Sequence, residues 1–504
     1  MTTIASGTDT LTRDALAVLQ PGFTGISAPS WLLRRLGEGL ASVGLFGRNI
    51  ASPAQLAALT AQLRAERDDV LVAIDEEGGD VTRLEVRMGS SFPGNHALGA
   101  VDDVRLTEAV AHELGRRLAA CGVNLNWAPS ADINSNPDNP VIGVRSFGAD
   151  AALVARHTAA YVSGLQSAGV AACTKHFPGH GDTAVDSHHA LPRIDADLSV
   201  LESRELVPFR AAIESGTRAV MSAHILVPAL DPDRPATLSR RVLTGLLREE
   251  LGYDGLIVTD GMEMQAIAGT YGIERGSVLA ISAGADAICV GGGLADDATV
   301  LRLRDALVAA VRSGELAEER LADAAARVRA LAAWTASANE RAPAGTSGPG
   351  GSSSDAVSDI GLVAARRALT VTRGAHFAPV TEAPYVAALT PVANIAVGDE
   401  TPWGVAAELC RLLPGTETGS FAGERAGADA LAAAGSRRVV VVVRDVHRHP
   451  WMAEALDTLL AARPDTVVVE MGVPQSPPRG ALHIATHGAA RVCGLAAAEV
   501  IAGA

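Results

Sequence analysis

The segment from Lys175 to His189, which reads KHFPGHGDTAVDSHH, is rich in side chains that could do chemistry. Its fifteen residues contain four histidines, two aspartates and one lysine. A purely structural loop rarely holds so many ionisable groups, because each must be hydrated or paired when the loop packs. Asp186 and His188 are two residues apart, and a carboxylate beside an imidazole can fix its tautomer and raise its pKa. We therefore expect acid/base chemistry at Asp186 and His188.

Two other interpretations of this segment remain open. Its polar side chains could serve only to hold a loop together. Alternatively, four of them could bind a metal ion: His176, His180, Asp182 and Asp186. Their spacing matches no standard ligand set on a helix or a knuckle, so we expect neither a metal nor another cofactor.

Three further segments carry single residues of interest. Asp260 ends the apolar run Gly255–Thr259, where it could act in catalysis or simply cap a helix. Asp75 follows the apolar start of VAIDEEGGDVTR, a segment that also contains a glycine pair and Arg83. Arg145 lies in NPVIGVRSFG, where it could bind a ligand or hold a loop.

The elements that position these residues alternate between short apolar runs and longer amphipathic runs, which is typical of parallel βα units. The expected strands are Gly44–Gly47, Val70–Ile74, Val123–Ala128, Ala171–Lys175, Ala219–His224, Gly255–Thr259 and Ala287–Val290. Seven or eight such units predict a (β/α)8 TIM-like barrel, with an open sheet as the alternative. Polar residues end several runs: Asp75, Asn126, Lys175, His224 and Asp260. Barrel active sites lie at that end of the strands.

A change in composition predicts a second domain. Residues 341–356 are rich in Gly, Ser and Pro, which cannot bury apolar area and therefore indicate a linker. We expect a barrel domain over residues 1–340 and a smaller α/β/α sandwich over residues 357–504. Its expected strands are Tyr385–Leu389, Asn394–Val397, Arg438–Val443 and Thr466–Glu470. No catalytic constellation stands out in it, so a structural or oligomerising role is expected.

Taken together, the motifs resemble those of glycoside hydrolase family 3, in particular its N-acetyl-β-glucosaminidase branch. KHFPGHGDT followed by DSH is highly specific to that branch, and IGVRSFG is similar to the family's IGDRSFG. DEEGG-x-V-x-R is similar to DQEGGRVQR, and VTDGMEM to the nucleophile motif. The resemblance implies that Asp260 is the nucleophile and His188 the acid/base, with Asp186 as its partner. It further implies sugar-binding roles for a second set: Asp75, Arg83, Arg145, Lys175 and His176.

The resemblance implies a retaining exo-β-N-acetylglucosaminidase that acts on cell-wall or chitin fragments through a covalent glycosyl-enzyme. A neutral histidine base repels anions less than a carboxylate does, so a phosphorylase that uses phosphate is the alternative. An inactive sugar-binding protein on the same fold is a third possibility. Glu76 and Asp80 replace the family's Gln and Arg. The negative charge that they add is expected to disfavour acidic substrate fragments.

Bulk composition excludes several partners. The net charge of −15 argues against nucleic acid or an acidic membrane surface, and leaves a small carbohydrate as the expected partner. The five cysteines have no metal-site or disulfide-framework spacing. Neither a secretory signal nor a run long enough to cross a bilayer is evident, so we expect a cytoplasmic protein.

Overall fold

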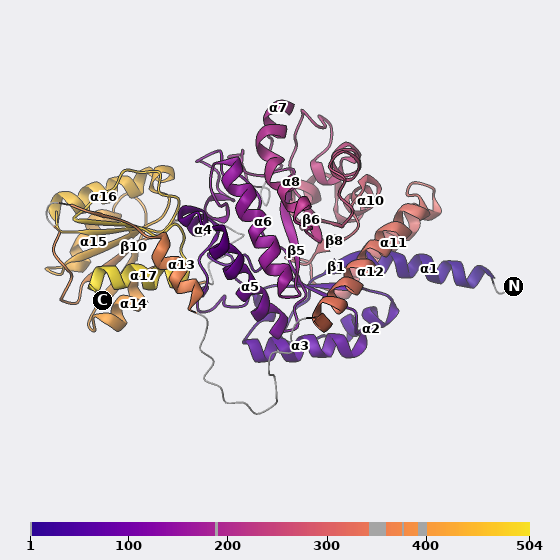
Figure 1. Cartoon of the computed structure of the whole chain (residues 1–504), viewed down its shortest axis with the longest axis horizontal. Coiled ribbons are helices and arrows are strands. Elements are labelled where there is room, and N and C mark those ends of the chain that lie inside the picture. The colour runs from indigo at the N-terminus through magenta and orange to yellow at the C-terminus, as the bar shows by residue number, and fades with distance from the viewer. Residues whose placement is uncertain (1–2, 187–189, 342–358, 375–376, 392–400, 504) are drawn as a thin grey trace. The chain divides into compact units, whose positions relative to one another are not determined.

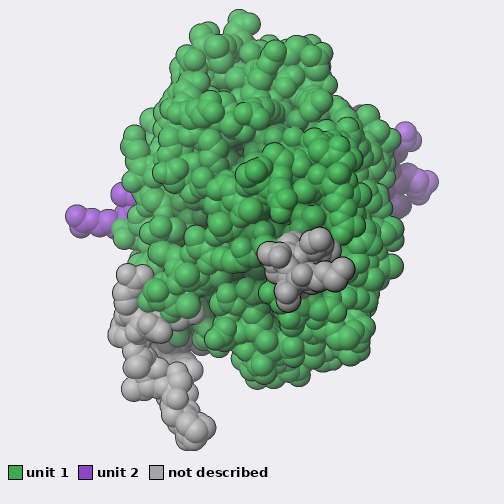
Figure 2. All heavy atoms as spheres, turned by 90° about the vertical axis from the view of Figure 1, so that its right-hand side faces the viewer, with its two compact units in different colours: residues 1–76, 107–140, 149–355 green, residues 77–106, 141–148, 356–504 purple. Residues whose placement is uncertain are grey.

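The computed structural model describes residues 3–186, 190–341, 359–374, 377–391 and 401–503 (Figure 1). The predicted linker falls almost entirely outside these residues. The chain divides into two compact units, which Figure 2 distinguishes by colour. Unit 1 contains residues 1–76, 107–140 and 149–355, and unit 2 contains residues 77–106, 141–148 and 356–504.

Unit 1 is built around parallel strands. Its described strands are β1 (Leu19–Pro21), β2 (Ser42–Leu45), β3 (Leu71–Ile74), β4 (Leu125–Asn126), β5 (Ala171–Phe177), β6 (Ala219–Ser222), β7 (Leu256–Thr259) and β8 (Ile288–Val290). Strands β2 to β7 pair in chain order, and β1 pairs with β8. Val258 bridges to Ala287 just before β8, while Ser42 Oγ donates to Leu19 O at 3.1 Å. The predicted TIM-like barrel is confirmed.

Helices connect successive strands and pack around the barrel (Figure 1). The main ones are α1 (Thr3–Ala17), α2 (Ser30–Glu38), α3 (Pro53–Glu66), α5 (Val104–Ala120), α6 (Ala151–Ser167), α8 (Val207–Glu214), η5 (Arg241–Glu250), α10 (Ile273–Ala283), α11 (Asp297–Arg312) and α12 (Glu318–Arg341). Side chains cap several of them, as where Asp150 accepts the Leu153 N–H at 2.7 Å. Most strands are buried on both faces, which explains their uninterrupted apolar sequences.

Unit 2 contains a six-stranded sheet in the order β11-β10-β12-β13-β14-β9. The strands are β9 (Thr370–Arg373), β10 (Tyr385–Leu389), β11 (Glu417–Phe421), β12 (Val439–Val443), β13 (Val467–Glu470) and β14 (Leu482–Ala485). All pairings are parallel except that of β9 with β14. The helices are α13 (Ile360–Ala368), α14 (Ala406–Leu412), α15 (Ala426–Ala434), α16 (Pro450–Ala462) and α17 (Arg491–Ala502).

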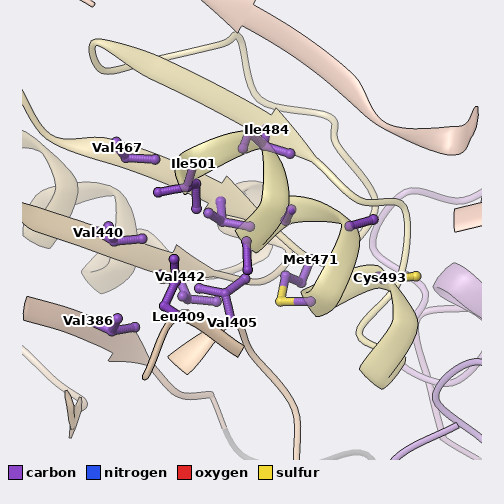
Figure 3. Packing of buried hydrophobic residues seen from close by; sticks show 14 of the residues in the cluster. Val386, Val405, Leu409, Val440, Val442, Val467, Met471, Ile484, Cys493 and Ile501 are labelled. Carbon is purple, nitrogen blue, oxygen red and sulfur yellow. The ribbon is translucent and has the colours of Figure 1, made fainter. Parts of the chain in front are cut away.

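This sheet has an apolar core on each face. Val440, Val442 and Ile484 pack with Leu409 and Ile501 on one face (Figure 3). Alternate β12 residues such as Val441 and Val443 enter the other core, which α15 and α16 cover. The strand period of two therefore serves both layers, and the predicted α/β/α sandwich is confirmed.

Three strands of unit 2 were not expected from the sequence, namely β9, β11 and β14. The edge strands β9 and β11 are largely exposed, and their sequences TVTR and ETGSF contain no apolar run. Expected strand Asn394–Val397 lies outside the described residues. In unit 1, the amphipathic pattern of residues Glu202–Ser215 predicts a single helix, but the structure divides this segment into η3 (Leu201–Glu205), a π-helical turn, and α8.

Two early segments of the chain pack within unit 2. Residues 77–106 include α4 (Asn95–Val101), which contacts α13, and residues 141–148 include η2 (Gly143–Arg145). The contact with α13 is close, because a Cβ on Gly361 would lie 1.9 Å from Ser91 O. The predicted domain boundary within residues 341–356 stays a prediction.

Candidate active site

The carboxyl ends of the barrel strands carry the first group of expected site residues. Asp75 directly follows β3, and Lys175 and His176 belong to the end of β5. The Lys175 ammonium donates to the Asp75 carboxylate. Lys175 is almost fully buried, whereas a quarter of the Asp75 side chain is exposed. The ion pair thus fixes the position of a partly accessible carboxylate.

A completely buried carboxylate, Asp132, organises the loops beside this pair. Asp132 accepts the Nδ1–H of His176 at 2.6 Å and the backbone N–H of His180 at 2.7 Å. Ser130 Oγ also donates to it at 2.9 Å. Burial alone would raise the pKa of Asp132, but the two histidines and these hydrogen bonds hold that pKa well below its ordinary value. The hydrogen bond to Asp132 thus fixes Nδ1 as a protonated nitrogen of the His176 ring and orients that ring.

Asp260 is positioned directly after β7. Its backbone N–H donates to Ser222 O at 3.1 Å, and its carboxylate accepts the Gly261 N–H at 2.8 Å. The charges of Asp75 and Asp260 add to burial in raising the pKa of the Cys173 and Cys289 thiols. Both carboxylates therefore act on the same pair of inward-facing thiols.

The charges of both Asp132 and Asp260 act on His180. Burial lowers its pKa to about 4, although the charges of Asp132 and Asp260 act in the opposite direction. The structure thus brings Asp260, His180 and the Asp132–His176 pair into one region of the barrel. Across the described part of the chain, no group of three or more His, Cys, Asp or Glu is arranged to hold a metal.

The expected acid/base pair is only partly described. Asp186 lies half-buried in the loop after β5, and its backbone carbonyl accepts the Ala190 N–H at 3.1 Å. His188 lies outside the described residues. The Asp186–His188 pairing stays a prediction.

A second buried carboxylate supports the start of this loop. Arg204 donates to Asp182 at 2.5 Å and to Glu205 at 2.6 Å. Glu205 is 1% exposed, and burial raises its pKa to about 7. Its Oε2 would lie 2.8 Å from a Cβ on Gly179, which has φ +125°. A Cβ on Gly181 would collide with Ile133 O at 1.6 Å, so both turn positions require glycine.

The two expected sugar-binding arginines belong to unit 2. Arg145 is 7% exposed and binds Glu77 in a bidentate manner, with Nε to Oε2 at 3.0 Å and Nη2 to Oε1 at 2.7 Å. Asn95 Nδ2 donates to the Arg145 carbonyl at 2.7 Å. Arg83 is half-buried. The pairing with Glu77 fixes the position of Arg145, and its expected role in binding the sugar stays a prediction.

An arginine balances the negative charge that Asp80 adds, and the expected effect on acidic substrate fragments stays a prediction. Asp80 is buried and ion-paired with Arg444, also in unit 2. Glu76 is 2% exposed, and its backbone N–H and carbonyl both bond the side chain of Asn126. An exposed carboxylate at these positions is therefore absent from the described structure.

Three residues that organise the site were missed in the sequence: Asp132, Glu77 and Glu205. Asp132 lies six residues after Asn126, at the carboxyl end of an expected strand, and that position was an available signal. Glu77 belongs to the DEEGG motif, which was also an available signal. Glu205 gave none, because acidic residues in amphipathic helices are normally exposed.

Comparison with known proteins identifies the class. A model described as the glycosyl hydrolase family 3 N terminal domain matches residues 34–331. The chain is 36% identical over 312 residues to beta-hexosaminidase A of Pseudoalteromonas piscicida, covering 57% of this chain and 52% of that protein. It is 37% identical over 265 residues to a beta-hexosaminidase of Neisseria meningitidis serogroup C, covering 51% of this chain and 73% of that protein. The chain thus spans about half the length of the Pseudoalteromonas relative.

A solved structure is similar over nearly the whole chain. It is a glycoside hydrolase family 3 beta-N-acetylglucosaminidase from Paenibacillus sp. str. FPU-7, with a TM-score of 0.87 and 37% identity. The match covers 98% of this chain and 96% of that one. A barrel with charged residues at its strand ends and these matches define a glycoside hydrolase. The chain belongs to glycoside hydrolase family 3, in its β-hexosaminidase branch, and its substrate is a carbohydrate.

No helix in the described ranges combines the length and the apolar character needed to cross a bilayer.

Proposed function

We propose that this chain is a retaining exo-β-N-acetylglucosaminidase that releases N-acetylglucosamine from cell-wall or chitin fragments. The observation that carries the proposal is the common location of Asp260 and the Asp75–Lys175 ion pair at the carboxyl ends of one set of barrel strands. The similarity to a beta-N-acetylglucosaminidase over the whole chain supports the choice of sugar.

Asp260 acts as the nucleophile in this proposal. Its carboxylate attacks the anomeric carbon as the glycosidic bond breaks, and the leaving oxygen takes a proton from His188, which Asp186 orients. In the second step, neutral His188 takes a proton from water, and the water oxygen displaces Asp260 from the sugar. The two steps restore both groups and retain the anomeric configuration.

The remaining residues hold the sugar. Asp75, which Lys175 holds in place, can accept two sugar hydroxyls. Asp132 orients the His176 ring and thereby defines the position of its Nε2. Arg83 and Arg145 complete the proposed set of donors.

A phosphorylase is the second candidate, because a neutral histidine base does not repel phosphate as a carboxylate would. The same first step forms the glycosyl-enzyme, and phosphate then displaces Asp260 to give the sugar 1-phosphate. The proposed cytoplasmic location is compatible with either reaction and stays a prediction.

The test is to incubate the protein with a nitrophenyl N-acetyl-β-glucosaminide, with and without phosphate, and to identify the sugar released. Free N-acetylglucosamine in both cases supports the hydrolase, and a phosphate-dependent sugar 1-phosphate supports the phosphorylase. Asp260→Ala is expected to abolish turnover, whereas Asp305→Ala, at an exposed position of α11, is expected to retain it. Full activity in folded Asp260→Ala would refute the assignment.

A further inference from the structure

The turn from Glu77 to Val81 in unit 2 carries two buried carboxylates in a defined geometry. The Glu77 N–H donates to Val81 O at 3.0 Å. Gly78 and Gly79 have φ of +77° and +63°, a pair of left-handed residues that favours glycine at both positions. A Cβ on Gly79 would lie 2.4 Å from the Cα of Gly94. The turn therefore has little freedom to rearrange.

The first carboxylate of the turn holds Arg145. The two Glu77 oxygens accept hydrogen bonds from separate nitrogens of the Arg145 guanidinium. The side chain of Glu77 is 3% exposed and that of Arg145 is 7% exposed. A bidentate pair fixes the plane of the guanidinium as well as its position. The orientation of Arg145 thus depends on the placement of the turn.

The second carboxylate fastens the same turn to the sheet of unit 2. Asp80 is ion-paired with Arg444, which directly follows β12, and accepts the N–H of Ala489 at 2.7 Å, shortly after β14. Its side chain is 1% exposed. One carboxylate therefore joins the turn to the carboxyl ends of two strands.

We propose that Arg444 is a positioning residue for Arg145 and acts through Asp80 and the turn between them. The inference rests on the proposed function, which assigns Arg145 to the sugar. In this proposal the sheet of unit 2 takes part in substrate binding, whereas the sequence predicted only a structural or oligomerising role for that domain.

The physical reason is the burial of charge. Without Arg444, the Asp80 carboxylate would be buried without its cation, a strongly unfavourable state. The turn would then move towards water or Asp80 would take up a proton. Either change shifts Glu77, and a small displacement of a substrate-holding group is costly to binding.

The first experiment compares Arg444→Met with Arg437→Met. Arg437 lies just before the other end of β12 and pairs with Glu417, so it is a matched control at a distance from the turn. In folded Arg444→Met we expect KM for the nitrophenyl glycoside to rise about tenfold, with kcat within about threefold, because a uniform loss of binding raises KM alone. Arg437→Met should keep KM. An unchanged KM in Arg444→Met would overturn the inference.

Two double variants separate positioning from a general loss of structure. Arg444→Met should add little to the KM of Arg145→Lys, because both changes act on the same contact. Asp80→Asn combined with Arg444→Met should recover much of the KM lost in Arg444→Met, because the unpaired charge is removed. Additive effects with Arg145→Lys, or no recovery with Asp80→Asn, would count against the proposal.

Hydrogen exchange gives a readout that does not depend on turnover. Peptides covering residues 77–81 and 141–148 should exchange faster in Arg444→Met than in Arg437→Met. If the wild-type protein fails to act on the glycoside, the proposed function fails, but this comparison still decides whether Arg444 holds the turn. Equal exchange in the two variants would overturn the inference.

Discussion

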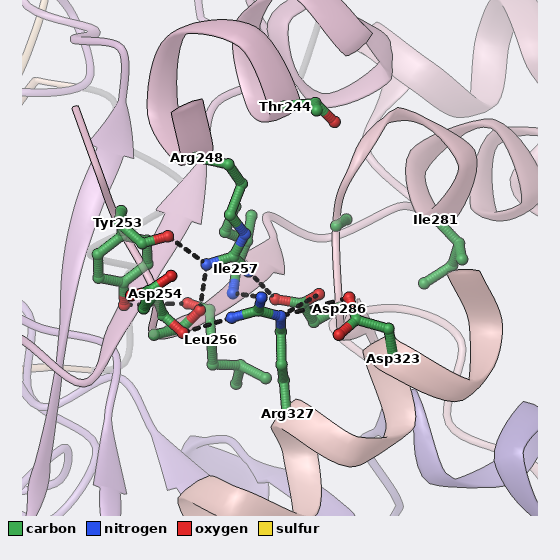
Figure 4. Close-up of polar contacts among 12 residues, drawn as sticks. Thr244, Arg248, Tyr253, Asp254, Leu256, Ile257, Ile281, Asp286, Asp323 and Arg327 are labelled. Carbon is green, nitrogen blue, oxygen red and sulfur yellow. Dashed lines mark hydrogen bonds and ion pairs between the residues drawn. The ribbon is translucent and has the colours of Figure 1, made fainter. Parts of the chain in front are cut away.

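Two fully buried aspartates in the barrel, Asp132 and Asp286, have opposite surroundings. Asp132 lies beyond the carboxyl end of β4, where it bonds His176 and His180. Asp286 precedes β8, at the amino end of the strands, and pairs with arginines from η5 and α12 (Figure 4). Both carboxylates are inaccessible to solvent.

The partners differ in what they can do. Arg248 and Arg320 donate both to Asp286 and to backbone carbonyls, and Asp286 also accepts the Ile257 N–H at 2.8 Å. Arginine keeps its charge at every physiological pH, so this network only ties elements together. Histidines can change protonation and present a second nitrogen to a ligand. We therefore expect Asp132 to act in function and Asp286 in structure, because Asp132 lies at the carboxyl end of the strands and its partners can titrate.

The largest expected effect is on stability, in Asp286→Ala. Removal of one member of a buried charge network costs about 3–5 kcal/mol, because the remaining arginines stay buried without their anion. We expect the denaturant midpoint to fall strongly, while kcat/KM of the folded protein stays within about threefold of wild type. A loss of kcat/KM beyond tenfold at full folding would break the comparison.

Asp132→Asn should affect catalysis first. The amide cannot stabilise the His176 ring as the carboxylate does, and its NH2 group opposes one of the present donors. We expect kcat/KM to fall about 10- to 100-fold, as is typical when the partner of a site histidine is changed. Steady-state kinetics of the folded variant measure this fall in kcat/KM, with Asp305→Asn as the control at an exposed position. Wild-type kinetics would place Asp132 with Asp286 as a structural residue.

The free energy of unfolding is expected to depend on pH through His180, which bonds Asp132. His180 has a pKa of about 4 in the folded protein and about 6.5 when unfolded, so its contribution to stability is complete above pH 6.5 and falls as the pH drops toward 4. Wild type should lose about 2 kcal/mol more than His180→Gln between pH 7 and pH 5. Denaturant unfolding at each pH measures this difference. Parallel curves for the two proteins would contradict it.

The raised pKa of Glu205 predicts a smaller change in the free energy of unfolding with pH, of opposite sign. Its pKa is about 7 in the folded protein and about 4.5 when unfolded, so its favourable contribution is present below pH 4.5 and is lost as the pH rises through 7. Wild type should lose about 1 kcal/mol relative to Glu205→Gln between pH 5 and pH 6. Unfolding of both proteins at the two pH values tests it, and a difference that does not grow with pH would refute it.

Much of the fold was predictable because local patterns agree with it. Strands such as β3 and β7 are short apolar runs that are followed directly by Asp75 and Asp260. Runs of this kind can be recognised from the sequence alone. Strand β1 was missed because three residues, LQP, carry no period. Helix α8 was expected to begin earlier, because nothing in the sequence marks the π-helical turn that ends at Glu205.

The sequence by itself determined the types of reactive residue and the ends of the strands that carry them, because both are local properties. Only the tertiary structure decided which charges meet: Lys175 with Asp75, His176 with Asp132, Glu77 with Arg145 and Asp80 with Arg444. The partners of these pairs are 44 to 364 positions apart along the chain, and no periodicity links such positions. Pairing over those distances follows from burial, which makes an unpaired charge costly and so selects the fold that neutralises it.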